Sequence, residues 1–142
     1  MKYVLDTNHI SILQTATGLA FAQLSARMAA HPEADFGLPV VSFHEQILGA
    51  HAYINRARKP AQVIRGYEML IEILNGYRDA LVVPFDSAAV TAFDGLKSLR
   101  LGTATMDLRI AAIAQSRGLT LLTQNTSDFA GIPGLVVEDW TV

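Results

Sequence analysis

Hydrophobic residues in this chain gather in short runs that alternate with longer segments of helical periodicity. The runs are rich in β-branched and aromatic residues and are bounded by glycine, proline and polar residues, which is typical of strands. They predict a sheet of four to five strands, at residues 2–5, 36–41, 81–83, 119–123 and 135–137.

The segments between these runs predict helices at residues 10–30 (with a break near 17–18), 43–57, 60–76, 86–99 and 103–117. Pro60 suits a first helical turn, Asp86 suits a helix cap, and Gly118 suits a helix stop. Thr103 or Thr105 is expected to cap the helix that ends before Gly118. Short strands separated by helices indicate βαβ units, and hence an α/β fold with a central parallel sheet flanked by helices.

Acidic residues occur close to the points where the predicted strands end. Asp6 follows the first strand and Asp128 lies just past the fourth. Glu45 falls in the first turn of the helix after the second strand, and Asp107 in the first turn of its own helix. The carboxyl ends of parallel strands share one edge of a sheet, where ligands bind. Because three of the four acids belong to such ends, we expect them to gather there.

Each acid also has a purely structural interpretation. Asp6 can cap the helix that follows it, and Ser42-x-x-Glu45 is a capping-box pattern. Asp107 near a helix N-terminus is favourable to the helix dipole, and Asp128 can be an ordinary polar loop residue. These interpretations account for the acids singly, but they do not predict that every apolar strand end should meet one.

Composition narrows the class of protein. The 142 residues are 51% hydrophobic and 17% charged, which indicates one globular domain over residues 1–142 without a membrane span. Cysteine is absent, which excludes disulfides and thiol catalysis and fits a reducing compartment, so we expect a cytoplasmic protein. With a net charge of −2 there is no bulk basic field. The basic cluster at residues 56–59 is expected to be a solvated helix end.

Four short motifs occur in an order that resembles one known family. They are Leu5-Asp6-Thr7-Asn8, Ser42-x-x-Glu45, Asp107-Leu108-x-Ile110-Ala111-Ala112 and Leu122-Thr123-x-Asn125-x-x-Asp128-Phe129, the last followed by Ile132-Pro133-Gly134-Leu135. The ordered set spans the whole chain and resembles the PIN domain, most closely that of VapC toxins from bacterial type II toxin–antitoxin pairs. No single motif is specific, because each is short; their order and spacing carry the resemblance.

The resemblance implies a PIN-like three-layer sandwich and a metal-dependent endoribonuclease, the toxin component of its pair. It implies that Asp6, Glu45 and Asp107 are catalytic acids that bind the metal. Many relatives have a carboxylate where this chain has Asn125. Two alternatives remain open at that position: Asp128 supplies the missing charge as a further catalytic acid, or Asn125 holds a metal-bound water.

The chemistry of RNA cleavage suits such a cluster. Phosphodiester hydrolysis needs an activated water and a stabilised leaving oxygen, and hard divalent cations bound by carboxylates can provide both. We therefore expect Mg²⁺ or Mn²⁺ as the cofactor. The side chains of Thr7, Asn8, Thr123 and Asn125 are expected to orient the acids by hydrogen bonds.

The resemblance also implies partners: an RNA substrate such as a tRNA or another structured RNA, a cognate antitoxin and a second copy in a homodimer. The helices over residues 43–76 carry more apolar side chains than one small sheet obviously needs. If they form a groove, an antitoxin segment can lay an amphipathic helix in it, and its Arg or Lys can reach the acid cluster and displace the metal.

Competing functions are less well supported by the residues. His44, Glu45 and His51 lack the H-E-x-x-H spacing of a zinc site, and neither a glycine-rich phosphate loop nor a G-x-S-x-G elbow occurs. A haloacid-dehalogenase-type phosphatase would have a second Asp where Asn8 stands. The alternative of another class is a non-catalytic PIN-like module that binds RNA or protein, which Asn125 would favour if the metal site has decayed.

Overall fold

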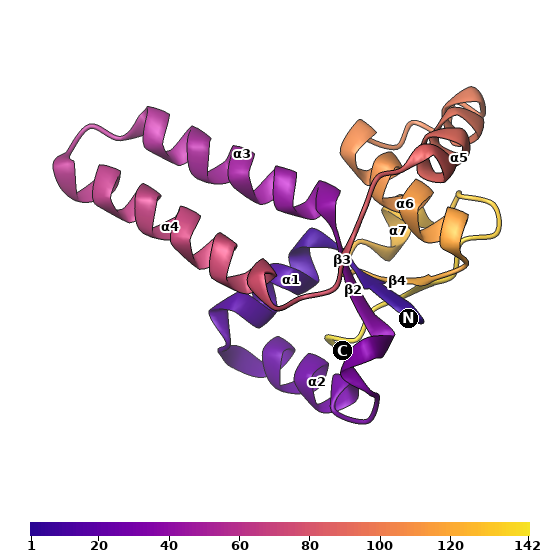
Figure 1. Ribbon diagram of the computed structural model, residues 1–142, viewed down its shortest axis with the longest axis horizontal. Coiled ribbons are helices and arrows are strands. Elements are labelled where there is room, and N and C mark those ends of the chain that lie inside the picture. Colours follow the sequence, from indigo (N-terminus) through magenta and orange to yellow (C-terminus); the bar gives the residue numbers. More distant parts are fainter.

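The computed structural model describes residues 1–142 and has a central sheet of five parallel strands (Figure 1). The order across the sheet is β3-β2-β1-β4-β5, with bounds β1 (Tyr3–Leu5), β2 (Phe36–Pro39), β3 (Val82–Val83), β4 (Thr120–Leu122) and β5 (Val137–Glu138). β1 lies in the centre and pairs in parallel with β2 on one side and β4 on the other. The predicted parallel sheet is therefore confirmed.

Helices cover both faces of this sheet, as a three-layer sandwich requires. They are α1 (Thr7–Thr15), α2 (Gly18–Met28), α3 (Val40–Arg56), α4 (Pro60–Arg78), α5 (Ser87–Ser98), α6 (Thr105–Arg117) and α7 (Thr126–Phe129), with a 3₁₀ turn at Glu33–Asp35. One core cluster joins α5 and α6 to the sheet, and a second joins it to α1, α2 and the inner parts of α3 and α4. The strands are consequently apolar on both sides.

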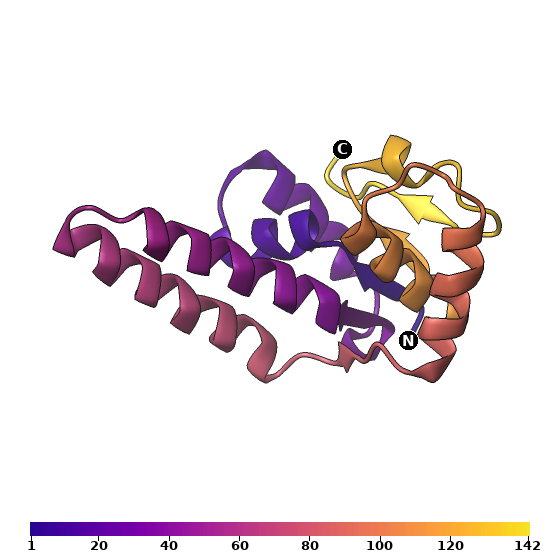
Figure 2. The same ribbon diagram turned by 90° about the horizontal axis from the view of Figure 1, so that it is seen from above.

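The helices α3 and α4 form a long antiparallel hairpin that projects away from the sheet (Figure 2). The turn between them carries Arg56, Arg58 and Lys59, all of them exposed. The basic cluster is thus the solvated helix end that the sequence predicts. None of the helices is long and apolar enough to cross a membrane.

The helix α6 contributes more buried residues than any other helix of the fold. Its residues Ile110, Ala111, Ala112, Ile113 and Ala114 are all fully buried between the sheet and α5. A helix that is apolar over most of its circumference is one that the fold covers on several sides. Because the rest of α6 is so well packed, its half-buried first turn is a firm support for the side chains that it carries.

The start of α3 differs from the prediction. The valines at positions 40 and 41 favour a strand by intrinsic propensity, but β2 ends at Pro39 and both valines are helical. Ser42 therefore lies inside the first turn, and its hydroxyl is buried without a hydrogen-bond partner. The capping-box interpretation of Ser42 and Glu45 is therefore wrong. Helix capping does not explain why an acid occurs at position 45.

Other helix ends give mixed outcomes. Asp86 caps α5 by accepting a hydrogen bond from the Ala89 amide (3.0 Å), and Gly118 ends α6 with φ 64°; both predictions are confirmed. Ala104 occupies the cap position of α6 without a side-chain hydrogen bond, so the predicted threonine cap is wrong. The sequence pattern does not predict the short α7, because a single turn leaves too little periodicity to detect.

The close contact of α3 with α4 yields a stability prediction. A methyl group at Gly66 on α4 would overlap the Ile54 side chain of α3, whereas one at Gly95 on α5 would meet nothing within 4 Å. We expect Gly66→Ala to destabilise the fold by about 1–3 kcal/mol through overpacking. Gly95→Ala is the matched control and should stabilise it by about 0.5–1 kcal/mol through helix propensity. Urea unfolding of both variants measures the difference, and equal shifts would contradict the packing argument.

Candidate active site

Asp6 is positioned by the pairing of the two central strands. It is the first residue after β1, and its amide donates to the Leu122 carbonyl at the end of β4 (2.9 Å). Its Oδ1 accepts a hydrogen bond from the Thr7 amide (2.8 Å), so it also caps α1, which begins at Thr7 and not near residue 10 as predicted. The side chain is 3% exposed. Asp6 therefore caps a helix and faces the carboxyl edge of the sheet at once.

The second oxygen of Asp6 is held by two side-chain donors. Its Oδ2 accepts from the Thr123 hydroxyl (2.7 Å) and from Asn8 Nδ2 (3.2 Å). Asn8 Nδ2 also donates to Thr123 Oγ1 (3.1 Å), which closes a triangle of polar groups across more than a hundred residues of sequence. The predicted contacts of Asn8 and Thr123 with Asp6 are thus present.

Two further acids converge on Asp6 from different helices. Glu45 lies in the second turn of α3 and accepts a hydrogen bond from the Thr7 hydroxyl (2.9 Å). Asp107 lies in the first turn of α6. Each of the three carboxylates has an oxygen within 4.8 Å of an oxygen from both others. The structure therefore brings together Asp6, Glu45 and Asp107 as the sequence predicts.

The pKa values of the three acids reflect both their burial and the negative charges near them. Burial raises the pKa of Asp6 and of Glu45 above their usual values, against the opposing effect of their hydrogen bonds. Burial, followed by the charges of Asp6, Glu45 and Asp128, raises the pKa of Asp107 to about 6. Three carboxylates at this spacing repel one another unless a cation lies among them. An all-oxygen donor set of this kind fits a hard divalent ion.

Asp128 and Asn125 occupy the rim of the site. Asp128 is exposed in α7 and lies outside the group of three acids, but it shares with Asp107 the lining of a cavity of about 400 Å³. Its charge contributes to the raised pKa of Asp107 and Asp6. Asn125 is exposed too, and it reaches the network only through its backbone amide, which donates to Thr123 Oγ1 (3.0 Å).

The histidines of α1 and α3 differ in burial. His44 and His51 are exposed on α3 and neither belongs to the acid cluster, in agreement with the argument against zinc. His9 is completely buried, and its Nδ1 lies 2.8 Å from Asn8 Oδ1. The sequence pattern does not single out His9; its only signal is an ionisable residue next to Ile10 on the buried face of α1.

Comparison with known proteins places this geometry in a family. No family model matches the chain. The tRNA(fMet)-specific endonuclease VapC of Shigella flexneri is 33% identical over 105 residues, covering 71% of this chain and 72% of that protein. The structure is similar to VapBC-1 from nontypeable Haemophilus influenzae (26% identity, all of both chains, TM-score 0.67). It is also similar to DNA-bound VapBC from Salmonella typhimurium (24% identity, 99% of this chain and 98% of that chain, TM-score 0.73). The protein therefore belongs to the VapC family and has its PIN-like fold.

Proposed function

We propose that this protein is a metal-dependent endoribonuclease and the toxin of a toxin–antitoxin pair, with residues 1–142 acting as one catalytic domain. The observation that carries the proposal is the convergence of Asp6, Glu45 and Asp107 within 4.8 Å at the carboxyl edge of the sheet. The Shigella relative is named as an endonuclease acting on tRNA(fMet), which supports RNA, and a tRNA in particular, as the substrate.

Within this proposal, the three clustered acids hold Mg²⁺ or Mn²⁺. When bound, such an ion neutralises phosphate charge and lowers the pKa of a coordinated water. The Thr7 hydroxyl fixes Glu45, and the donors Asn8 and Thr123 fix one oxygen of Asp6. These hydrogen bonds restrict the rotation of the carboxylates and so hold the donor oxygens in place before substrate arrives.

The cavity between the loop before α6 and the start of α7 offers an entry for the RNA backbone. Asp107 on one wall and Asp128 on the other face this space, which the segment Leu101–Ala104 and Ser127 complete. We assign Asp128 the role of the fourth acid, since its charge already acts on Asp107 and on Asp6. Asn125 supports the site by its backbone contact with Thr123.

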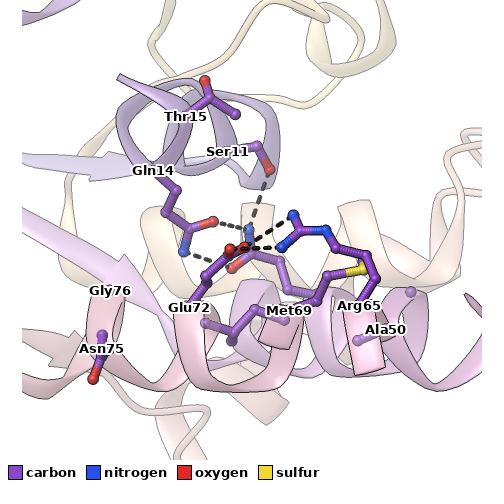
Figure 3. A pocket seen from close by; sticks show the side chains of 12 residues that line it. Ser11, Gln14, Thr15, Ala50, Arg65, Met69, Glu72, Asn75 and Gly76 are labelled. Atoms are coloured by element: carbon purple, nitrogen blue, oxygen red, sulfur yellow. Dashed lines mark hydrogen bonds and ion pairs between the residues drawn. The ribbon is translucent and has the colours of Figure 1, made fainter. Parts of the chain in front are cut away.

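A cleft of about 840 Å³ between α1, α3 and α4 supports a protein partner (Figure 3). Its floor includes a hydrogen-bonded pair, Gln14 and Gln46 (2.7 and 3.2 Å), and Gln46 also donates to Ser11 (3.2 Å). Arg65 extends along one side to Glu72, 2.7 Å away. The lining combines these polar side chains with Ala50, Met69 and Ile73, so it can accept both faces of an amphipathic segment. Further apolar residues of α4 lie outside the cleft.

The cleft leads towards the acid cluster, because Gln46 follows Glu45 on α3 and Ser11 lies one helical turn beyond Thr7 on α1. An antitoxin segment in the cleft could therefore extend an Arg or Lys to the carboxylates. Several solved structures of similar fold are VapBC or toxin–antitoxin complexes, which supports an antitoxin as the occupant.

The surplus apolar residues form an exposed stripe along α4. They are spaced three or four apart and each is more than half exposed: Ile64, Tyr67, Ile71 and Leu74. Such a stripe on one helix face favours burial in an assembly. It supports the proposal that the chain acts as a homodimer, in a complex with its antitoxin, or as both.

The catalytic proposal is tested by the variant Asp107→Asn. The matched control is Asp94→Asn, at an exposed position on α5. An amide is a weaker ligand for a hard cation, so we expect Mn²⁺-dependent cleavage of tRNA to fall about 100-fold or more in the first variant and to persist in the control. Thermal melts separate this result from misfolding. In chelator, the melting temperature of Asp107→Asn should equal or exceed that of the parent. Mn²⁺ should raise the melting temperature of the parent but not that of Asp107→Asn. Unchanged cleavage would show that the acids are not ligands.

The raised pKa of Asp107 predicts a pH dependence of stability in chelator. Between about pH 4 and pH 6 the folded protein retains a proton on Asp107 that the unfolded chain has released. Stability contributed by this group therefore falls as pH rises through that window. Asp107→Asn carries no charge at any pH, so its melting advantage over the parent should be greatest near neutrality and vanish towards about pH 4. A difference independent of pH would contradict the electrostatic origin of the strain.

Occupation of the cleft is tested by filling it. Gly49 on α3 lines the cleft, and a Cβ added there meets nothing within 4 Å, so the side chain of Gly49→Phe starts in open space at the cleft. A urea unfolding curve checks that the variant is as stable as the parent. We expect it to weaken antitoxin binding by about tenfold or more while RNA cleavage persists. Gly95→Phe, at an equally open helical position on α5, is the control and should bind like the parent. Calorimetric titration with the antitoxin measures both, and parental affinity for Gly49→Phe would place the antitoxin elsewhere.

A further inference from the structure

The buried His9 is joined to the acid cluster through a single intermediary, Asn8. His9 Nδ1 lies 2.8 Å from Asn8 Oδ1, while Asn8 Nδ2 contacts Asp6 Oδ2 and Thr123 Oγ1. On its other side the ring contacts the C-terminal segment, where the Trp140 amide donates to Nε2 (3.4 Å). His9 has no exposed surface, so it cannot serve as a surface group or as a proton carrier to solvent.

The partners of Asn8 determine which way its amide points. Asp6 Oδ2 already accepts from the Thr123 hydroxyl and, as a carboxylate oxygen, can only accept, so the Asn8 atom beside it must be the NH₂ group. The Gln124 amide donates to the other end of Asn8 (3.1 Å), which must therefore be the carbonyl oxygen. Both neighbours require the same orientation.

The orientation of Asn8 in turn determines the tautomer of His9. A carbonyl oxygen cannot donate, so Nδ1 must carry the hydrogen in the 2.8 Å contact with Asn8 Oδ1. Nε2 is then free to accept the Trp140 amide hydrogen. Asp139 Oδ1 is 3.8 Å from Nε2, too far for a hydrogen bond, and it already accepts from the amide and hydroxyl of Thr141. Burial lowers the pKa of His9 to about 4, against the effect of Asp139, which agrees with a neutral ring.

We propose that His9 is a positioning residue for the catalytic site: its Nδ1–H holds the amide of Asn8 so that Nδ2 stays on Asp6 and Thr123. This inference rests on the proposed nuclease function, since it names how one of the metal-binding acids is oriented. Every donor and acceptor of the Asn8 amide is used in the arrangement, so loss of the His9 donor leaves one Oδ1 contact, to Gln124, to resist rotation. Asp6 Oδ2 would then lose the Asn8 donor for part of the time, and the Asp6 carboxylate would be less firmly oriented.

Two substitutions separate the two ring nitrogens. The amide of Asn reaches the same distance from Cβ as Nδ1, so His9→Asn retains the donor to Asn8 and leaves a cavity on the Trp140 side. The amide of Gln reaches as far as Nε2, so His9→Gln retains an acceptor for Trp140 and loses the donor to Asn8. A merely structural role predicts that activity follows stability in the two variants. A positioning role predicts that His9→Asn is the less stable and yet the more active.

We expect His9→Gln to lower kcat for Mn²⁺-dependent RNA cleavage by about tenfold, with a smaller change in KM, and His9→Asn to stay within about twofold of the parent. The double variant with Asn8→Ala completes a cycle: if His9 acts through Asn8, His9→Gln costs nothing further once the Asn8 amide is absent. Equal losses in His9→Asn and His9→Gln, or a full additional loss on the Asn8→Ala background, would overturn the proposal.

Nuclear magnetic resonance in chelator provides a readout that does not depend on activity. The imidazole of His9 should show its bonded hydrogen on Nδ1, and the two Nδ2 hydrogens of Asn8 should give separate, slowly exchanging signals in the parent and in His9→Asn only. If the parent protein cleaves no RNA although these signals are present, the proposed nuclease function is rejected and the contact of His9 with Asn8 remains supported. An Nε2–H tautomer, or Asn8 signals unchanged in His9→Gln, would reject the positioning role itself.

Discussion

The parallel pairing of β1 with β4 is the interaction on which the site depends. The Leu122 carbonyl accepts a hydrogen bond from the Asp6 amide at the end of this pair, and Thr123, the first residue after β4, donates its hydroxyl to the Asp6 carboxylate. Because the strands are parallel, both chains leave the sheet at the same edge, and α1 and α7 begin there. A shift of one residue in register would turn Thr123 to the opposite face and separate it from Asp6.

The same edge concentrates negative charge that the fold does not neutralise by itself. Asp6, Glu45 and Asp107 have raised pKa values chiefly because they are buried, and no arginine or lysine charge acts to lower these pKa values. The large core around α6 and the sheet offsets this strain. A cation bound among the three carboxylates would relieve this strain. Strain of this kind is common at functional sites, and the VapC relative is an endonuclease.

The buried polar network explains how the repelling carboxylates keep one arrangement. Thr123 Oγ1 donates once and accepts twice, and the Asn8 amide is similarly saturated between Asp6, Thr123, Gln124 and His9. Fully satisfied networks specify one arrangement, whereas a partly satisfied one would allow several. The C-terminal segment takes part through Trp140, so residues at both ends of the chain define the position of one carboxylate.

Much of this architecture is readable in the sequence: the alternation of strands and helices, the parallel sheet and the placement of the acids near strand ends. Local periodicity and capping residues indicate these features directly. The prediction for the start of α3 is wrong. Val40 and Val41 favour strands by intrinsic propensity, but they are helical in the structure, where they pack against the core. Three features became visible only in the folded protein: Glu45 does not cap its helix, the cleft has a mixed polar and apolar lining, and His9 contacts Asn8. Those facts depend on side chains from distant segments, and no local pattern encodes their distances.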